Sequence, residues 1–176
     1  DTLSAIASEF SYFARMPEPE NETINLDALV RKSLIMYKDV SSIHIAFHPS
    51  SSVKWVYADR RQLLRVCSNL INNAIEAIEV LPAMNGRIVL QTDTEGSEHI
   101  VRISDNGKGI QKEESDKIFQ PNFTTRSGGA GLGLAIVKEI VHSVRGSIRF
   151  TSDPGKITTF TIRFPASSAP VSEKEQ

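Results

Sequence analysis

The chain has 176 residues, of which 40% are hydrophobic and 23% are charged, and its formal net charge is −1 at pH 7. This size and composition predict one folded domain with a short appendage. The near-neutral charge gives no electrostatic footprint for nucleic acid or for an acidic membrane surface. The one cysteine, Cys67, excludes an internal disulfide, and no apolar run approaches the ~20 residues that span a bilayer. We therefore expect no nucleic-acid partner, no direct membrane contact and a reducing, cytoplasmic location.

The first segment predicts a short helix followed by a linker. Four apolar side chains at helical spacing form a stripe over residues 2–15: Leu3, Ile6, Phe10 and Phe13. Pro17 and Pro19 end this helix, and the polar run 18–23 predicts a linker. Because a helix this short is not stable in isolation, we expect the stripe to pack against a partner helix. Because the chain opens in mid-pattern without Met, we expect it to be a fragment of a longer protein.

The next elements are a helix, a hairpin and a long helix. Residues 27–37 predict an amphipathic helix, and the alternating runs 43–47 and 53–57 predict a β-hairpin around a Pro-Ser turn. The period becomes helical over residues 60–80. The predicted apolar face of this helix comprises Leu63, Val66, Cys67, Leu70, Ile71, Ala74, Ile75 and Ile78. A second face carries four polar side chains: Gln62, Asn69, Asn73 and Glu76.

The remainder predicts a second hairpin, a long loop, a helix and two strands. The hairpin covers 87–92 and 99–104, and the polar residues 106–130 form a loop of the length typical of lids. A helix over 132–144, strands over 147–151 and 158–164, and a disordered tail complete the chain. The prediction is an α+β fold, a two-layer sandwich in which three helices cover one face of a sheet of about six strands.

Three groups of residues suggest a nucleotide site. Glycines at 129, 131 and 133 run into a helix, whose N-terminal N–H groups favour an anion such as phosphate. Asp105 ends a strand and meets a glycine turn, where a carboxylate can accept a hydrogen bond from an exocyclic amine such as that of adenine. Asn69 and Asn73 offer neutral oxygens, which suit Mg²⁺ beside nucleotide phosphates. Each group alone is also compatible with a plain turn or a mutual amide pair.

In this order the motifs resemble the ATP-binding domain of histidine kinases. Residues 69–74 (NLINNA) resemble its N box, 105–110 (DNGKGI) its G1 box, 118–126 (IFQPNFTTR) its F box, and 129–138 (GAGLGLAIVK) its G2 box. The run 59–63 (DRRQL) resembles the lead-in to the N box. Residues 9–19 resemble the exit from the dimerisation hairpin of NtrY-like nitrogen-regulation sensors. The resemblance covers about residues 25–165.

The resemblance implies a Bergerat-type fold with a mixed sheet, which binds ATP and Mg²⁺ under a mobile lid. It implies Asn73 as the Mg²⁺ ligand and Asn69, Asn73 and Arg126 as the catalytic set. The implied nucleotide-binding residues are Asn69, Asn73, Asp105, Gly107, Gly109, Phe119, Phe123, Thr124, Thr125, Arg126, Gly129, Gly131, Leu132 and Gly133. It further implies residues 1–20 as the end of the dimerisation hairpin and its linker, 21–166 as the catalytic domain and 167–176 as a disordered tail.

Some positions depart from the family pattern. Asn122 stands where an aromatic residue is usual, Ile157 replaces a glycine, and Glu76 replaces a cation near the phosphates. Residues 144–146 (VRG) replace the common His-Gly-Gly. None of the four histidines has the His-Glu-x-x-x-Pro context of a phosphoacceptor: His44, His48, His99 and His142.

The expected activity is transfer of the ATP γ-phosphate to a histidine on a dimerisation domain, with a response regulator downstream and a homodimer as the full-length state. Three alternatives stay open. They are a gyrase- or MutL-like ATPase, a serine-kinase anti-sigma factor and a nucleotide-binding adaptor without catalysis. The hydrolases place a Glu one helical turn before the Mg²⁺ ligand, where this chain has Asn69.

Overall fold

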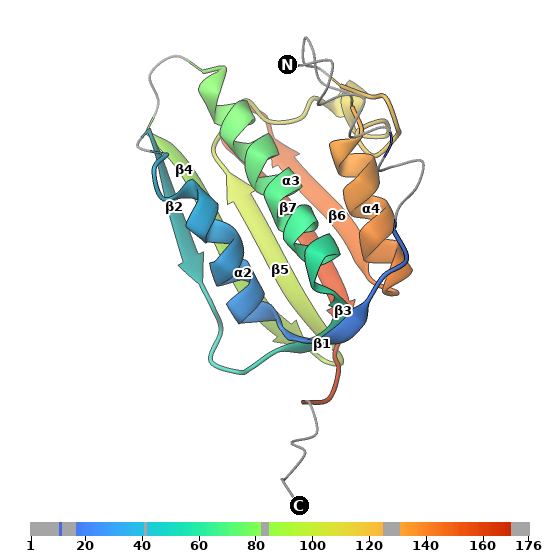
Figure 1. The fold of residues 1–176 in the computed structure, drawn as a ribbon. Helices are drawn as coiled ribbons and strands as arrows, with labels where there is room; N and C mark the ends of the chain where they lie inside the picture. The colour runs from blue at the N-terminus through green and yellow to red at the C-terminus, as the bar shows by residue number, and fades with distance from the viewer. Residues whose placement is uncertain (1–10, 12–16, 41, 82–84, 125–130, 170–176) are drawn as a thin grey trace, which may run out of the picture.

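A mixed five-stranded sheet, covered on one face by three helices, organises the fold (Figure 1). This computed structural model describes residues 11, 17–40, 42–81, 85–124 and 131–169. The strands are β2 (Ile43–His48), β4 (Gly86–Glu95), β5 (Glu98–Asp105), β6 (Ser147–Asp153) and β7 (Ile157–Pro165), in the order β2-β4-β5-β7-β6. Only the β2–β4 pair of this sheet is parallel; the other pairs are antiparallel. The predicted α+β sandwich with a mixed sheet is confirmed.

The helices follow the predicted periodicity closely. They are α2 (Leu26–Leu34), which continues into the 3₁₀ turn η1 (Ile35–Tyr37), α3 (Arg60–Glu79) and α4 (Gly133–Ser143). A further 3₁₀ turn, η2 (Lys112–Glu114), lies in the long loop after β5. In Figure 1 the helix α3 crosses the middle of the sheet between α2 and α4. All of the predicted apolar face of α3 except Ile75 is buried.

The core lies between this helical layer and the inner face of the sheet. Cys67 belongs to it, and burial raises the pKa of its thiol to about 11, so the group stays protonated and unreactive at neutral pH. The second hairpin also forms as predicted, since β4 and β5 pair antiparallel around the turn at Gly96. Burial of the apolar surface between the helices and the sheet is the main source of stability, at roughly 25 cal/mol per Å² removed from water.

The predicted hairpin of residues 43–57 is wrong. β2 pairs with β4, and β3 (Trp55–Asp59) pairs antiparallel with β1 (Asn21–Asn25) in a separate two-stranded sheet. The linker predicted over 18–23 is therefore wrong from Asn21 onward, and the described residues contain seven strands rather than about six. Two apolar residues of the predicted run 53–57, Val53 and Tyr57, are more than half exposed.

A buried lysine stands directly before β3. Lys54 is 0% exposed; its Nζ lies 3.2 Å from Asp27 Oδ2 and donates to the Ser52 carbonyl at 2.6 Å. Asp27 also accepts a hydrogen bond from the Thr92 hydroxyl. Because the charge is paired and hydrogen-bonded, the side chain can be buried, and the strand presents Lys54, Val56 and Ala58 inward. A pattern of apolar residues alone points to the opposite face.

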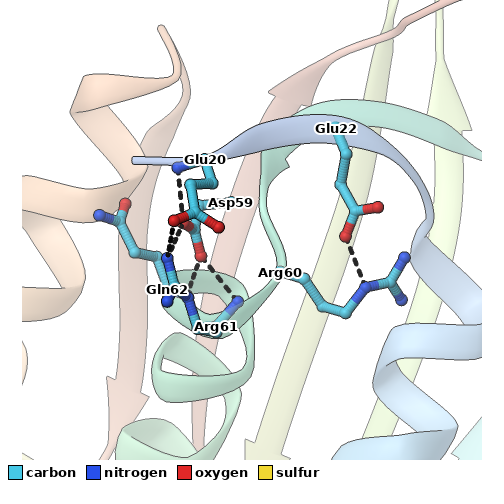
Figure 2. A network of polar contacts seen from close by, with 6 residues as sticks. All are labelled: Glu20, Glu22, Asp59, Arg60, Arg61 and Gln62. Carbon is cyan, nitrogen blue, oxygen red and sulfur yellow. Dashed lines mark hydrogen bonds and ion pairs between the residues drawn. The ribbon is translucent and has the colours of Figure 1, made fainter. Parts of the chain in front are cut away.

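The strand β1 is joined to the start of α3 by a polar network, drawn in Figure 2. The Asp59 carboxylate caps α3 by accepting from the backbone N–H groups of Arg61 and Gln62, and its second oxygen accepts from the Glu20 backbone N–H at 2.8 Å. The Arg60 and Glu22 side chains pair at 2.6 Å. Burial raises the pKa of Asp59, but these hydrogen bonds outweigh it and hold the pKa below its usual value.

The two ends of the chain bear on the domain prediction. Ala166 and Ser167 donate backbone hydrogen bonds to the carbonyls of Ser97 and Trp55, so the chain stays attached to the sheet just past β7. The predicted stripe of residues 3–13 lies outside the described residues. Within the described segments, no helix has both the length and the apolar character to cross a membrane.

Candidate nucleotide-binding site

The polar face of α3 contacts the glycine segment that starts α4. Asn69 donates a hydrogen bond from Nδ2 to the Gly133 carbonyl at 3.2 Å. A Cβ on Gly133 would lie 3.8 Å from the Asn69 amide carbon, which is ordinary contact. Since the amide nitrogen is used in this bond, the Asn69 oxygen remains as an acceptor or ligand atom. Asn73 lies one turn further along the same face and is half-buried.

The N-terminus of α4 is open to an anion. The helix begins at Gly133, and no side chain caps its first N–H groups, since the residue at the cap position is Leu132. These groups carry the positive end of the helix dipole. Leu132 itself is buried in the core, so it fixes the position of the helix start rather than offering a polar group to a ligand.

Asp105 ends β5 on the inner face of the sheet and is only 5% exposed. Its Oδ1 accepts a hydrogen bond from the Gly107 backbone N–H at 2.9 Å. Burial raises the pKa of the carboxyl to about 6, although the Gly107 hydrogen bond lowers it. At neutral pH the group is therefore mainly ionised and acceptor-only, as recognition of an exocyclic amine requires.

The loop after Asp105 is pressed against the C-terminal part of α3. A Cβ on Gly107 would stand 2.5 Å from the backbone carbonyl carbon of Ala77, so no side chain fits there. The next residue, Lys108, donates its backbone N–H to the Ala77 carbonyl at 2.8 Å. Gly109 has φ +78°, and a Cβ there would approach the Pro154 Cα to 2.6 Å. Both glycines are needed for close packing of backbone on backbone.

One face of α3 thus contacts both glycine segments. Ala77 touches the Gly107 turn, and Asn69 holds Gly133, with Asn73 between them at four-residue spacing. Eight residues of helix rise about 12 Å, which is the scale of a nucleoside triphosphate from base to phosphates. The arrangement can therefore hold a base near Asp105 at one end and phosphates near the start of α4 at the other.

The segment before α4 is held by aromatic and backbone contacts. The Phe119 ring meets Phe150 and Phe160 edge-on, with centroids 6.2 and 6.4 Å away, and the Lys138 ammonium lies 5.9 Å from its centroid. Gly131 has φ +66°, and a Cβ there would come within 2.8 Å of the Phe123 backbone. Phe119 is thus held against β6 and β7, and Phe123 is half-buried.

Asn122, the departure noted above, has φ 65°. Asparagine tolerates this left-handed conformation better than most residues, which gives a local reason for its presence. Three implied site residues, Thr125, Arg126 and Gly129, lie outside the described residues. Thr124 is exposed.

A polar row across three strands was not predicted from the sequence. The register places Thr158 of β7 opposite Asp105 of β5 on one side and Ser152 of β6 on the other. Thr158 is 3% exposed, and its hydroxyl lies 3.0 Å from that of Ser152. The alternation of Thr158 with the buried Phe160, Ile162 and Phe164 could have revealed an inward polar residue beside Asp105.

The donor set near α3 suits a hard cation. Amide oxygens are ligands that Mg²⁺ accepts together with phosphate oxygens and waters. In the described part of the chain, no group of three or more His, Cys, Asp or Glu residues could hold a metal ion. The metal prediction therefore depends on Asn73, with the Asn69 oxygen beside it, and these residues fit Mg²⁺ brought by a nucleotide.

Sequence comparison matches residues 58–168 to the family described as histidine kinase-, DNA gyrase B- and HSP90-like ATPases. The sensor histidine kinase ZraS of Salmonella typhimurium is 34% identical over 169 residues, which cover 94% of this chain and 36% of ZraS. The nitrogen regulation protein NtrY of Azorhizobium caulinodans is 31% identical, over 86% of this chain and 20% of its own length. The chain thus spans about a third or less of these relatives.

Solved structures agree with the sequence match. The catalytic domain of the histidine kinase ThkA superposes with a TM-score of 0.73 at 29% identity, over 83% of this chain and 95% of that domain. A complex of ThkA with the response regulator protein TrrA gives a TM-score of 0.77 at 25% identity, over 94% of this chain and 48% of the ThkA chain.

Proposed function

The chain belongs to the family of histidine kinase-, DNA gyrase B- and HSP90-like ATPases, and from this premise we propose that it transfers the γ-phosphoryl group of ATP to a histidine on a dimerisation domain. Its sequence and fold are those of the ATP-binding catalytic domain of sensor histidine kinases. The transfer, the metal and the partners are the proposed part, because the chain spans only a fraction of its relatives.

The observation that carries the proposal is the shared face of α3. Contacts from Ala77 to Gly107 and from Asn69 to Gly133 fix the two glycine segments at a separation that fits one nucleotide. In phosphoryl transfer the protein contributes mainly positioning and charge stabilisation rather than covalent chemistry. A rigid helix between base site and phosphate site meets that need.

The proposed roles combine this placement with the resemblance to the histidine kinase motifs. Asp105 accepts a hydrogen bond from the adenine amine, and Gly107 and Gly109 leave room for the base. Asn69 and the α4 N-terminus hold the phosphates, with Gly129, Gly131 and Gly133 as the phosphate loop. Asn73 holds Mg²⁺, which when bound supplies positive charge at the phosphate oxygens. Arg126 completes the catalytic set, and Phe119, Phe123, Thr124 and Thr125 complete the nucleotide-binding set. The buried Leu132 contributes to this set by fixing the start of α4.

In the transfer itself, the acceptor imidazole nitrogen forms a bond to the γ-phosphorus while the bond to the β–γ bridging oxygen breaks, and ADP leaves. Hydrolysis by water should be slow. A general base would stand at position 69, but Asn69 has no basic group and its amide nitrogen already donates to Gly133. Lack of a base removes a contribution of roughly 10²–10⁴-fold. This argues against the gyrase- and MutL-like ATPases as models for the activity.

The partners and the domain division belong to the same proposal. In it, residues 1–20 are the end of the dimerisation hairpin and its linker, 21–166 are the catalytic domain, and 167–176 are the segment that follows it. The same proposal includes a homodimer as the full-length state, a downstream response regulator and a cytoplasmic location. The complex of ThkA with TrrA supports the response regulator as partner.

Calorimetry with a non-hydrolysable ATP analogue tests the nucleotide assignment. We expect one binding site per chain, with affinity that falls at least about tenfold when Mg²⁺ is removed by a chelator. A chain that binds no adenine nucleotide in either condition would contradict the proposal.

A further inference from the structure

Ser152 makes contacts that no role above uses. It lies on β6 at the end of the sheet, and its hydroxyl oxygen accepts a hydrogen bond from the Ile110 backbone N–H at 2.9 Å. Its hydroxyl also lies 3.0 Å from that of Thr158, across the β6–β7 pair. It therefore links the loop after Asp105 to the strand that lies directly beside Asp105.

The loop 106–110 is attached on two sides. On its α3 side, the contact of Gly107 with Ala77 and the Lys108 backbone bond fix its first half. On its β6–β7 side, the Gly155 backbone N–H donates to the Lys108 carbonyl at 3.1 Å, and Ser152 holds Ile110. The Ser152 hydroxyl therefore fastens the second half of the loop, and the Ile110 side chain packs against the core.

Packing around Ser152 leaves little freedom. A Cβ on Gly109 would stand 3.1 Å from the Ser152 Oγ, so the loop backbone already lies against the hydroxyl. Residues directly opposite on antiparallel strands have Cβ atoms about 5 Å apart. The row Asp105, Thr158 and Ser152 therefore places the Ser152 hydroxyl two strands from the carboxylate, within one layer of side chains.

We propose that Ser152 is a positioning residue for base recognition, whose hydroxyl fixes the 106–110 loop against the sheet and so sets the shape of the adenine end of the site. The proposal rests on the proposed function, since it presumes that the base lies beside Asp105. Removal of the hydroxyl would leave the Ile110 N–H without its acceptor and would loosen the second half of the loop.

The test compares Ser152→Ala with Ser104→Ala in titrations with analogues of ATP and GTP. Ser104 is a matched control, because its hydroxyl also pairs with a threonine of β7, Thr159, at 2.8 Å, but it has no bond to the loop. Ser152→Ala should weaken ATP-analogue binding about tenfold, which is about 1.4 kcal/mol, and GTP-analogue binding less than about twofold. Ser104→Ala should change neither by more than about twofold, and Ser152→Thr, which keeps a hydroxyl, should restore most of the loss.

The outcomes separate this inference from the function it rests on. A wild-type chain that fails to bind the ATP analogue refutes the proposed function. A wild-type chain that binds, with Ser152→Ala equal to Ser104→Ala or weakened equally for both analogues, refutes the positioning role alone.

Amide hydrogen exchange adds a test on the wild-type chain, which does not depend on whether a variant folds. The Ile110 N–H should exchange at least about tenfold more slowly than in an unstructured peptide, even without nucleotide. Exchange at the unstructured rate would overturn the inference.

Discussion

The ionisation of Asp105 gives a quantitative test of the base site. Burial raises its pKa to about 6. The ionised carboxylate is a pure acceptor and suits the adenine amine, whereas the protonated carboxyl carries an O–H donor and is the weaker acceptor. The ionised fraction falls from about nine tenths near pH 7 to about one tenth near pH 5. Affinity for an ATP analogue should therefore fall about tenfold over this range beyond any change due to the phosphates.

Asp105→Asn supplies the control for this titration. The amide does not titrate, so its binding curve reports the phosphates alone, and its affinity near pH 7 should be about tenfold weaker, as expected for one mismatched buried hydrogen bond. Isothermal titration of both proteins with one analogue, from about pH 5 to about pH 8, measures the difference. Parallel curves for the two proteins would refute the reasoning.

The same carboxyl predicts the pH dependence of folding. Because its folded pKa lies above the unfolded value of 3.8, the folded protein binds more protons between about pH 4 and pH 6. Its contribution to the free energy of unfolding is therefore largest in acid and decreases as pH rises, by up to about 3 kcal/mol for two pKa units. Asp105→Asn should lose this decline in denaturant unfolding, and an unchanged decline would contradict the assigned burial.

Four further substitutions test other contacts and backbone conformations. Asn73→Ala should abolish the Mg²⁺ dependence of nucleotide binding in calorimetry while circular dichroism stays unchanged; a retained Mg²⁺ dependence would refute the assignment. Gly107→Ala should destabilise the fold by roughly 1–3 kcal/mol and weaken nucleotide binding, because its Cβ would stand 2.5 Å from Ala77 backbone. Gly96→Ala is the control: φ there is +60°, but nothing lies within 4 Å of an added Cβ, so the free energy of unfolding should fall by about 1 kcal/mol while nucleotide binding stays intact. Equal losses of binding in Gly96→Ala and Gly107→Ala would contradict the role given to the close packing at Gly107. Arg145→Gly should raise stability by up to about 1 kcal/mol in thermal unfolding, because Arg145 has φ 59°, and no gain would argue against strain there.

The local features of this fold could be predicted from sequence because they depend on neighbours along the chain. The 3.6-residue period of α3 identifies its buried and polar faces, and the turn at Gly96 identifies the β4–β5 hairpin. The glycines at 107, 109 and 131 were also recognised, and each is now explained by a close backbone contact. The order of the four motifs along the chain indicated the resemblance to the histidine kinase ATP-binding domain.

What could not be predicted depends on pairing between distant segments. The polar strand β1 has no apolar alternation, and its partner β3 lies some thirty residues away. Lys54 is buried only because Asp27 and Ser52 meet it in the folded state. The row of Asp105, Thr158 and Ser152 exists only once β5, β7 and β6 lie side by side.

Transfer of labelled phosphate tests the central claim most directly. The chain is mixed with γ-labelled ATP and Mg²⁺, alone and with a separate helical hairpin that carries a His-Glu-x-x-x-Pro motif from a related sensor kinase. The account predicts no label on the chain itself and acid-labile, base-stable label on the hairpin, at a rate that rises greatly when the two are tethered. Label on the isolated chain, or none on an intact tethered hairpin, would contradict the account.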